Sequence, residues 1–241
     1  MAEKRGQILN LTKKPKKVTV IEGFPGFGLV GTITTGFLID HLKCEQIGKH
    51  YFEEPPVTLA IHDGKLIDPI GIFYNKKYNI AIVHSISHAT GGLEWKAAEI
   101  IMDLAEQLEA KEIITIEGVG STETTECRAF HHTTVQNTKT KLKSLGYESL
   151  NEGIIIGVTS ALLLKTKIPT TSLFAETHSQ LPDSKAAAKI IELLDKYLKL
   201  EVDYHPLLKQ AEVFEERLKT ILEQSKKAKD LKEKKNLSYL G

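Results

Sequence analysis

The chain has 241 residues and a formal net charge of +1, with 41% hydrophobic and 26% charged residues, a composition typical of globular proteins and not of disordered or membrane proteins. No apolar run is long enough to span a bilayer, and the basic N-terminus lacks the apolar segment of a secretory signal. We therefore expect a cytoplasmic protein without membrane contact. The two cysteines, Cys44 and Cys127, lack metal-type spacing and indicate reduced thiols.

Apolar, β-branched runs alternate with helical patterns along most of the chain. The predicted helices are 28–42, 93–109, 138–145 and 184–199, the last with Asp183 as its N-cap. The predicted strands are 18–21, 57–63, 70–75, 78–85, 112–120, 127–135, 153–158 and 170–177. Such alternation predicts an α/β fold, in which a mainly parallel sheet is flanked by helices on both faces. The segment 57–85 is expected to be an antiparallel insertion or edge.

The pattern changes after Pro206. Apolar residues then recur at alternating spacings of four and three, which predicts a long helix over 207–234 with a coiled-coil seam. This helix is expected to lie on the body or to pair with a neighbouring subunit. We divide the chain into an α/β domain, 1–203, and a C-terminal helical extension with a mobile tail, 204–241. The predicted oligomer seam consists of Leu207, Phe214, Leu218 and Ile221.

The first strand runs into a glycine-rich turn, "EGFPGFGLVG" at 22–31. Its residues Gly26, Gly28 and Gly31 have the G-x-G-x-x-G spacing of dinucleotide-binding turns, in which a helix N-terminus holds a phosphate. The acidic residue that would hold a ribose about 20 positions later has no good candidate, and Phe27 would crowd a pyrophosphate. We therefore expect the glycines to serve close strand–helix packing. Anion binding at this turn is kept as the alternative.

Three acidic residues, Glu22, Glu117 and Glu176, each follow an apolar strand. Parallel strands would bring them to one edge of the sheet, where carboxylates bind a metal, activate water or hold a basic partner group. The alternative is that each accepts hydrogen bonds from the backbone of the next turn. His84 and Ser85 also end a strand, but no G-x-S-x-G elbow or metal-type histidine spacing accompanies them. We expect no catalytic residue, cofactor or metal.

Several motifs occur in an order that resembles one known family. The motifs are "EGFPGFGLVG" (22–31), "EGVGS" (117–121), "GIIIGVTSALLL" (153–164), "IPTTSLFAETHSQLPDSKAAAKII" (168–191) and "LEVDYHPLLKQAE" (200–212). Together they are similar to the proteasome assembly chaperone family in its archaeal homologue branch. The resemblance implies a fold like that of nucleoside phosphorylases without their active site. It also implies a homo-oligomer, with four to five subunits as our estimate, that binds proteasome α-subunits.

Both ends of the chain are basic, whereas the body between them is acidic. Basic ends are able to contact nucleic acid or an acidic protein surface, or simply to be solvated; we do not expect nucleic-acid binding. Some archaeal relatives end in a hydrophobic–tyrosine–any-residue motif that inserts between α-subunits, whereas the tyrosine here is third from the end. The residues expected to bind a partner are Lys232, Lys234, Lys235, Leu237, Tyr239 and Leu240.

The sequence therefore predicts a non-enzymatic, oligomeric binding protein of the proteasome assembly chaperone type. Its partner is expected to be proteasome α-subunits or a related protein. The alternative is an enzyme that handles nucleotides or nucleosides and uses the turn at Gly26, Gly28 and Gly31 as an anion site.

Overall fold

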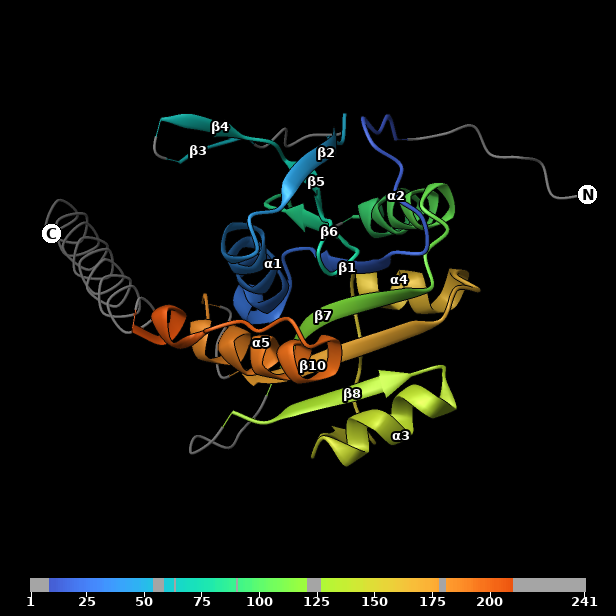
Figure 1. Cartoon of the computed structure of the whole chain (residues 1–241), viewed down its shortest axis with the longest axis vertical. Helices are drawn as coiled ribbons and strands as arrows, with labels where there is room; N and C mark the ends of the chain where they lie inside the picture. Colours follow the sequence, from blue (N-terminus) through green and yellow to red (C-terminus); the bar gives the residue numbers. More distant parts are fainter. Residues whose placement is uncertain are drawn as a thin grey trace, which may run out of the picture.

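The computed structural model describes residues 9–53, 59–62, 64–89, 91–120, 127–177 and 181–209. Its centre is an eight-stranded mixed sheet in the order β2-β5-β6-β1-β7-β10-β8-β9 (Figure 1). The strands are β1 (Thr19–Gly23), β2 (Glu45–His50), β5 (Ile70–Asn75), β6 (Ile80–Ser85), β7 (Glu112–Gly120), β8 (Ala129–Thr133), β9 (Glu148–Ser149) and β10 (Thr170–Thr177). Strands β6, β1, β7 and β10 form a parallel block, and β5 and β8 flank it in the antiparallel direction.

Helices cover both faces of the sheet. The helices are α1 (Val30–His41), α2 (Leu93–Gln107), α3 (Gln136–Ser144), α4 (Val158–Lys165) and α5 (Ser184–Leu198), and a short 3-10 turn, η1 (Phe27–Leu29), precedes α1. Figure 1 shows α2 and α4 together on one side of the parallel block and α1 and α5 on the other, with α3 beside β8. The α/β fold with a mainly parallel sheet is thus confirmed.

Two hydrophobic layers explain the nearly continuous apolar runs of the central strands. On β7, Ile113 packs into the layer under α2 and α4, whereas its neighbour Ile114 packs into the layer under α1 and α5. Likewise Val20 and Ile21 of β1 are fully buried on opposite faces. A strand buried on both faces has to be apolar at every position, and it therefore lacks the alternation of an edge strand.

Local signals located several elements accurately. The predicted N-cap of α5 is confirmed: Asp183 Oδ1 accepts a hydrogen bond of 2.9 Å from the backbone N–H of Ala186. The antiparallel hairpin of β5 and β6 is also confirmed. Its turn is closed by the side chain of Asn75, which accepts a hydrogen bond from the N–H of Tyr78 at 3.0 Å.

Two predicted strands were wrong in whole or in part. Residues 153–158 form no strand: Gly157 has φ +80, Ile154 is 91% exposed, and α4 begins at Val158. Three consecutive β-branched isoleucines favour a strand locally, but here no neighbouring strand pairs with them. Within the predicted strand 57–63, Ala60–His62 form β3, which pairs with β4 (Lys65–Ile67) in a separate hairpin, and Leu59 is not part of it (Figure 1). Residues 57, 58 and 63 lie outside the described residues.

Residues 205–209 are helical, and the rest of the predicted helix over 207–234 lies outside the described residues. Leu207 is 8% exposed and packs on the layer under α1 and α5 of its own chain. The other members of the predicted seam, Phe214, Leu218 and Ile221, lie outside the described residues, so the seam stays a prediction.

Candidate functional site

The carboxyl ends of β1, β7 and β10 meet the glycine turn, by which we mean residues 23–29 between β1 and α1. Gly28 has φ +66, a left-handed conformation that favours glycine. A Cβ at Gly28 would also lie 2.8 Å from Oγ1 of Thr177 on β10. A Cβ at Gly31 would lie 2.9 Å from the carbonyl oxygen of Ile116 on β7. Both contacts correspond to the close-packing role expected for these glycines.

The third glycine, Gly26, lies against the carboxyl group of Glu117. A Cβ at Gly26 would overlap the Oε1 atom of that carboxyl. The backbone N–H of Phe27 also interacts with this carboxyl and lowers the pKa of Glu117 against the larger effect of burial. In a dinucleotide-binding turn, backbone N–H groups of this kind would face a phosphate. Here the carboxyl group of Glu117 occupies that position, and a phosphate would have to displace it.

The carboxyl group of Glu22 contacts the backbone at the start of the same turn. Its Oε2 atom accepts a hydrogen bond of 3.1 Å from the N–H of Phe24. The carboxyl is almost completely buried, and burial raises the pKa of Glu22 to about 7. Burial and the nearby Glu22 charge together raise the pKa of Glu117 to about 8.

Thr159, in the first turn of α4, connects the two acidic residues. Its Oγ1 atom lies 3.2 Å from Oε1 of Glu22 and 3.4 Å from Oε2 of Glu117. We refer to Glu22 and Glu117 as the carboxyl pair. The prediction that these two residues reach the same edge of the sheet is confirmed. The alternative that each accepts a hydrogen bond from the following backbone is confirmed for Glu22.

A second set of bonds ties the turn to α5. Oγ1 of Thr177 donates to Oδ2 of Asp183 at 2.7 Å. The backbone N–H of Asp183 donates to the carbonyl oxygen of Gly28 at 2.9 Å. Asp183 therefore caps α5 and holds the glycine turn at the same time.

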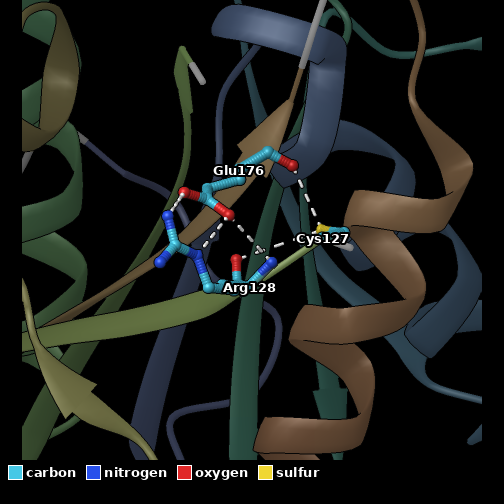
Figure 2. A network of polar contacts seen from close by, with 3 residues as sticks. All are labelled: Cys127, Arg128 and Glu176. Atoms are coloured by element: carbon cyan, nitrogen blue, oxygen red, sulfur yellow. Dashed lines mark hydrogen bonds and ion pairs between the residues drawn. The ribbon is translucent and has the colours of Figure 1, made fainter. Parts of the chain in front are cut away.

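The third acidic residue, Glu176, is engaged separately (Figure 2). Its carboxylate accepts two hydrogen bonds from the guanidinium of Arg128, at 2.9 and 2.7 Å, and a third from the backbone N–H of Arg128. The Sγ atom of Cys127 lies 3.1 Å from the carbonyl oxygen of Glu176, and burial raises the pKa of this thiol to about 11. The cysteine is therefore a thiol rather than a thiolate nucleophile at neutral pH.

The histidine and serine at the end of β6 do not form a catalytic pair. Nδ1 of His84 is hydrogen-bonded to Oγ1 of Thr35 at 2.9 Å, whereas Ser85 Oγ lies within hydrogen-bonding distance of the backbone carbonyl oxygens of Pro69 and Ser87, to one of which it donates. Burial lowers the pKa of His84 to about 4. Across the described ranges, no group of three or more His, Cys, Asp or Glu side chains is arranged to hold a metal ion.

The predicted partner-binding residues, Lys232, Lys234, Lys235, Leu237, Tyr239 and Leu240, lie outside the described residues. Sequence reasoning missed Thr159, because the segment before it was assigned to a strand and α4 was not predicted. The local signal for α4 was Gly157 followed by the apolar run "ALLL", which a strand prediction ending at 158 left unexplained.

In this α/β sandwich, the carboxyl groups of Glu22 and Glu117 lie against the backbone of the glycine turn, where a nucleotide-binding protein would hold a phosphate. The chain belongs to the PAC2 family, whose model matches residues 20–222. Among solved structures it is similar to PbaA of Pyrococcus furiosus, described as an archaeal homologue of proteasome-assembly chaperone. The two are 30% identical, the match covers 94% of this chain and 97% of that one, and the TM-score is 0.77.

Two further proteins extend the comparison. PbaB of Pyrococcus furiosus, described as an archaeal proteasome activator, is 23% identical over 88% of this chain and 97% of its own, with a TM-score of 0.74, and this likeness shows the fold alone. An uncharacterized protein of Methanocaldococcus jannaschii is 29% identical over 231 residues, 92% of each chain. No helix within the described part of this chain is long and apolar enough to cross a membrane.

Proposed function

We propose that this chain is a non-enzymatic, homo-oligomeric binding protein of the proteasome assembly chaperone type, with proteasome α-subunits as its partner. The observation that carries the proposal is the relationship to PbaA, which extends over nearly the whole length of both chains. Membership of the PAC2 family supports it.

The geometry of the glycine turn supports a binding protein rather than a nucleotide enzyme. The Glu117 carboxyl occupies the side of the turn that would face a phosphate. The carboxyl pair is bonded to the backbone and to Thr159, and Asp183 is bonded to Thr177, so these groups already have partners inside the protein. A nucleotide that bound here at 100 times its dissociation constant would stabilise the fold by about 2.7 kcal/mol. Thermal unfolding with and without nucleotides is therefore a direct check, and we expect no change in Tm.

We place partner recognition in the C-terminal extension. Leu237, Tyr239 and Leu240 would supply an apolar anchor, because buried aromatic residues dominate many interfaces. Lys232, Lys234 and Lys235 would attract an acidic surface, and this attraction would weaken with added salt.

The test is binding of the full chain to purified α-subunits, compared with a chain that lacks 236–241. We expect the deletion to reduce affinity about tenfold or more while Tm and subunit number stay unchanged. Tyr239→Ala should reproduce most of the loss, and Ser238→Ala serves as the matched control. Wild-type protein that fails to bind α-subunits would contradict the proposed function. Undiminished binding by the truncated chain would contradict only the role of the tail.

A further inference from the structure

The contacts of Thr159 constrain the protonation of the carboxyl pair. A threonine hydroxyl has one hydrogen to donate and lone pairs to accept. Oγ1 of Thr159 lies within hydrogen-bonding distance of both Glu22 Oε1 and Glu117 Oε2. If both carboxyls were ionised, both would be acceptors only, and one of the two contacts would have no hydrogen. Both contacts are satisfied when one carboxyl is protonated and donates to Thr159, which in turn donates to the other.

The surroundings of the pair favour retention of this proton. Both carboxyls lie on the α2 and α4 side of the sheet, Glu22 almost completely buried and Glu117 partly buried, and no cation of the described ranges is among the groups that shift their pKa values. On the adjacent strands, the apolar Val83 and Phe174 are paired in register with Glu22 and Glu117. A second negative charge in this position would lack a compensating partner.

The other titratable groups nearby are already engaged elsewhere. Glu176, on the same strand as Phe174, is bonded to Arg128. His84 is bonded to Thr35 on α1, and Asp183 is bonded to Thr177. The glycine turn and α4 present no charged side chain between Gly23 and Leu29 or between Val158 and Leu164. The proton is therefore shared within the pair and Thr159.

The pair also holds the glycine turn at two points. Glu22 accepts a hydrogen bond from the N–H of Phe24, and Glu117 touches Gly26 and interacts with the neighbouring N–H of Phe27. A change in the spacing of the carboxyls would move both ends of the turn relative to α4. We propose that Glu22, Glu117 and Thr159 form a protonation latch, in which one shared proton closes the glycine turn onto α4 and loss of that proton loosens it.

The latch is tested by native-state hydrogen exchange of the full chain, with the amides of Phe24 and Phe27 as reporters and those of Ile82 and Ile114 as references. After correction for intrinsic exchange, we expect protection of the reporters relative to the references to fall about tenfold between about pH 7.5 and about pH 9. In Glu117→Gln the amide donates to Thr159 permanently, so this fall should disappear. Thr159→Ser keeps the hydroxyl and should behave as wild type, whereas Thr159→Val should lose protection already at about pH 7.5.

Carbon-13 NMR of the glutamate side chains in the wild-type protein is the second measurement, and it does not depend on any variant folding. One protonated carboxyl near pH 7, shared between Glu22 and Glu117, is the expected result. Two ionised carboxylates near pH 7, wild-type protection that does not change with pH, or an equal fall in Glu117→Gln would each overturn the proposal.

Discussion

The carboxyl group of Glu117 lies so close to Gly26 that no side chain fits between them. This contact joins the end of β7 to the turn that follows β1, over ninety positions away in the sequence. It also explains why the glycines of this turn have the spacing of a nucleotide-binding motif. The same glycines that let a phosphate approach a backbone let a carboxyl of the protein approach it.

A methyl group at Gly26 should therefore be destabilising, and the penalty should depend on Glu117. We expect Gly26→Ala to lower the free energy of unfolding by about 1–3 kcal/mol, because the new Cβ displaces the Glu117 carboxyl from its place beside Thr159. In the background Glu117→Ala, the same change should cost less, with a coupling of about 1 kcal/mol in a double-mutant cycle. Urea unfolding of the four proteins measures this coupling. Strictly additive effects would show that the contact is unimportant for stability.

Gly28 provides a second test of the packing role. Gly28→Ala combines a left-handed φ with a contact to Thr177, and we expect a loss of about 1–3 kcal/mol. Gly146 is the matched control, because it also has a positive φ, +90, but nothing lies within 4 Å of an added Cβ. Gly146→Ala should therefore cost only the backbone strain, about 1 kcal/mol. The prediction is contradicted if the two substitutions lower stability equally.

The sequence predicted some residues of the candidate site and missed the partners of others, and the difference has a physical cause. Glu22 and Glu117 follow strands whose apolar runs are local signals, and parallel pairing then brings both to one edge of the sheet. Glu176 follows a similar strand, yet it bonds to Arg128, a partner supplied by an antiparallel neighbour that local patterns do not specify. Thr159 was missed for a related reason, since its place is set by the crossover from β9 to α4.

Edge strands were similarly hard to predict. Strand β2 reads "EQIGKH", with Ile47 as its only fully buried apolar side chain, and its pairing with β5 is interrupted between Gln46 and Gly48. A polar edge strand resembles a loop in composition, because only one side of it is paired. The central strands, buried on both faces, carry a much stronger signal.

His84 makes stability depend on pH on the acid side. Burial lowers its pKa from 6.5 to about 4, so between these values the unfolded chain binds more protons than the folded one. His84 by itself should therefore make stability rise as pH increases from about 4 to about 6.5, by at most about 1.4 kcal/mol per pH unit, whereas the raised pKa values of Glu22 and Glu117 act in the opposite direction above about pH 4.5. His84→Gln, which keeps a polar group near Thr35, should remove the contribution of His84 and so make the slope of stability against pH more negative in this range. The unfolding midpoint in urea at several pH values measures it, and an unchanged slope in the variant would contradict the assignment.

The residues of the predicted seam differ in role, although they share one spacing pattern. Leu207 packs within its own chain, whereas we expect Leu218 to contact a neighbouring subunit. Leu207 is buried on its own chain, so Leu207→Ala should lower the free energy of unfolding by about 2 kcal/mol, a value at the low end for core leucines because this residue lies near the surface. It should leave the subunit number unchanged. Leu218→Asp places a charge on the predicted intersubunit stripe, and it should reduce the subunit number with little effect on the folding of the α/β domain. Light scattering at micromolar concentration and thermal unfolding, applied to both variants, distinguish these outcomes. A monomeric wild type would refute the seam, and so would a Leu218→Asp protein that keeps the wild-type subunit number.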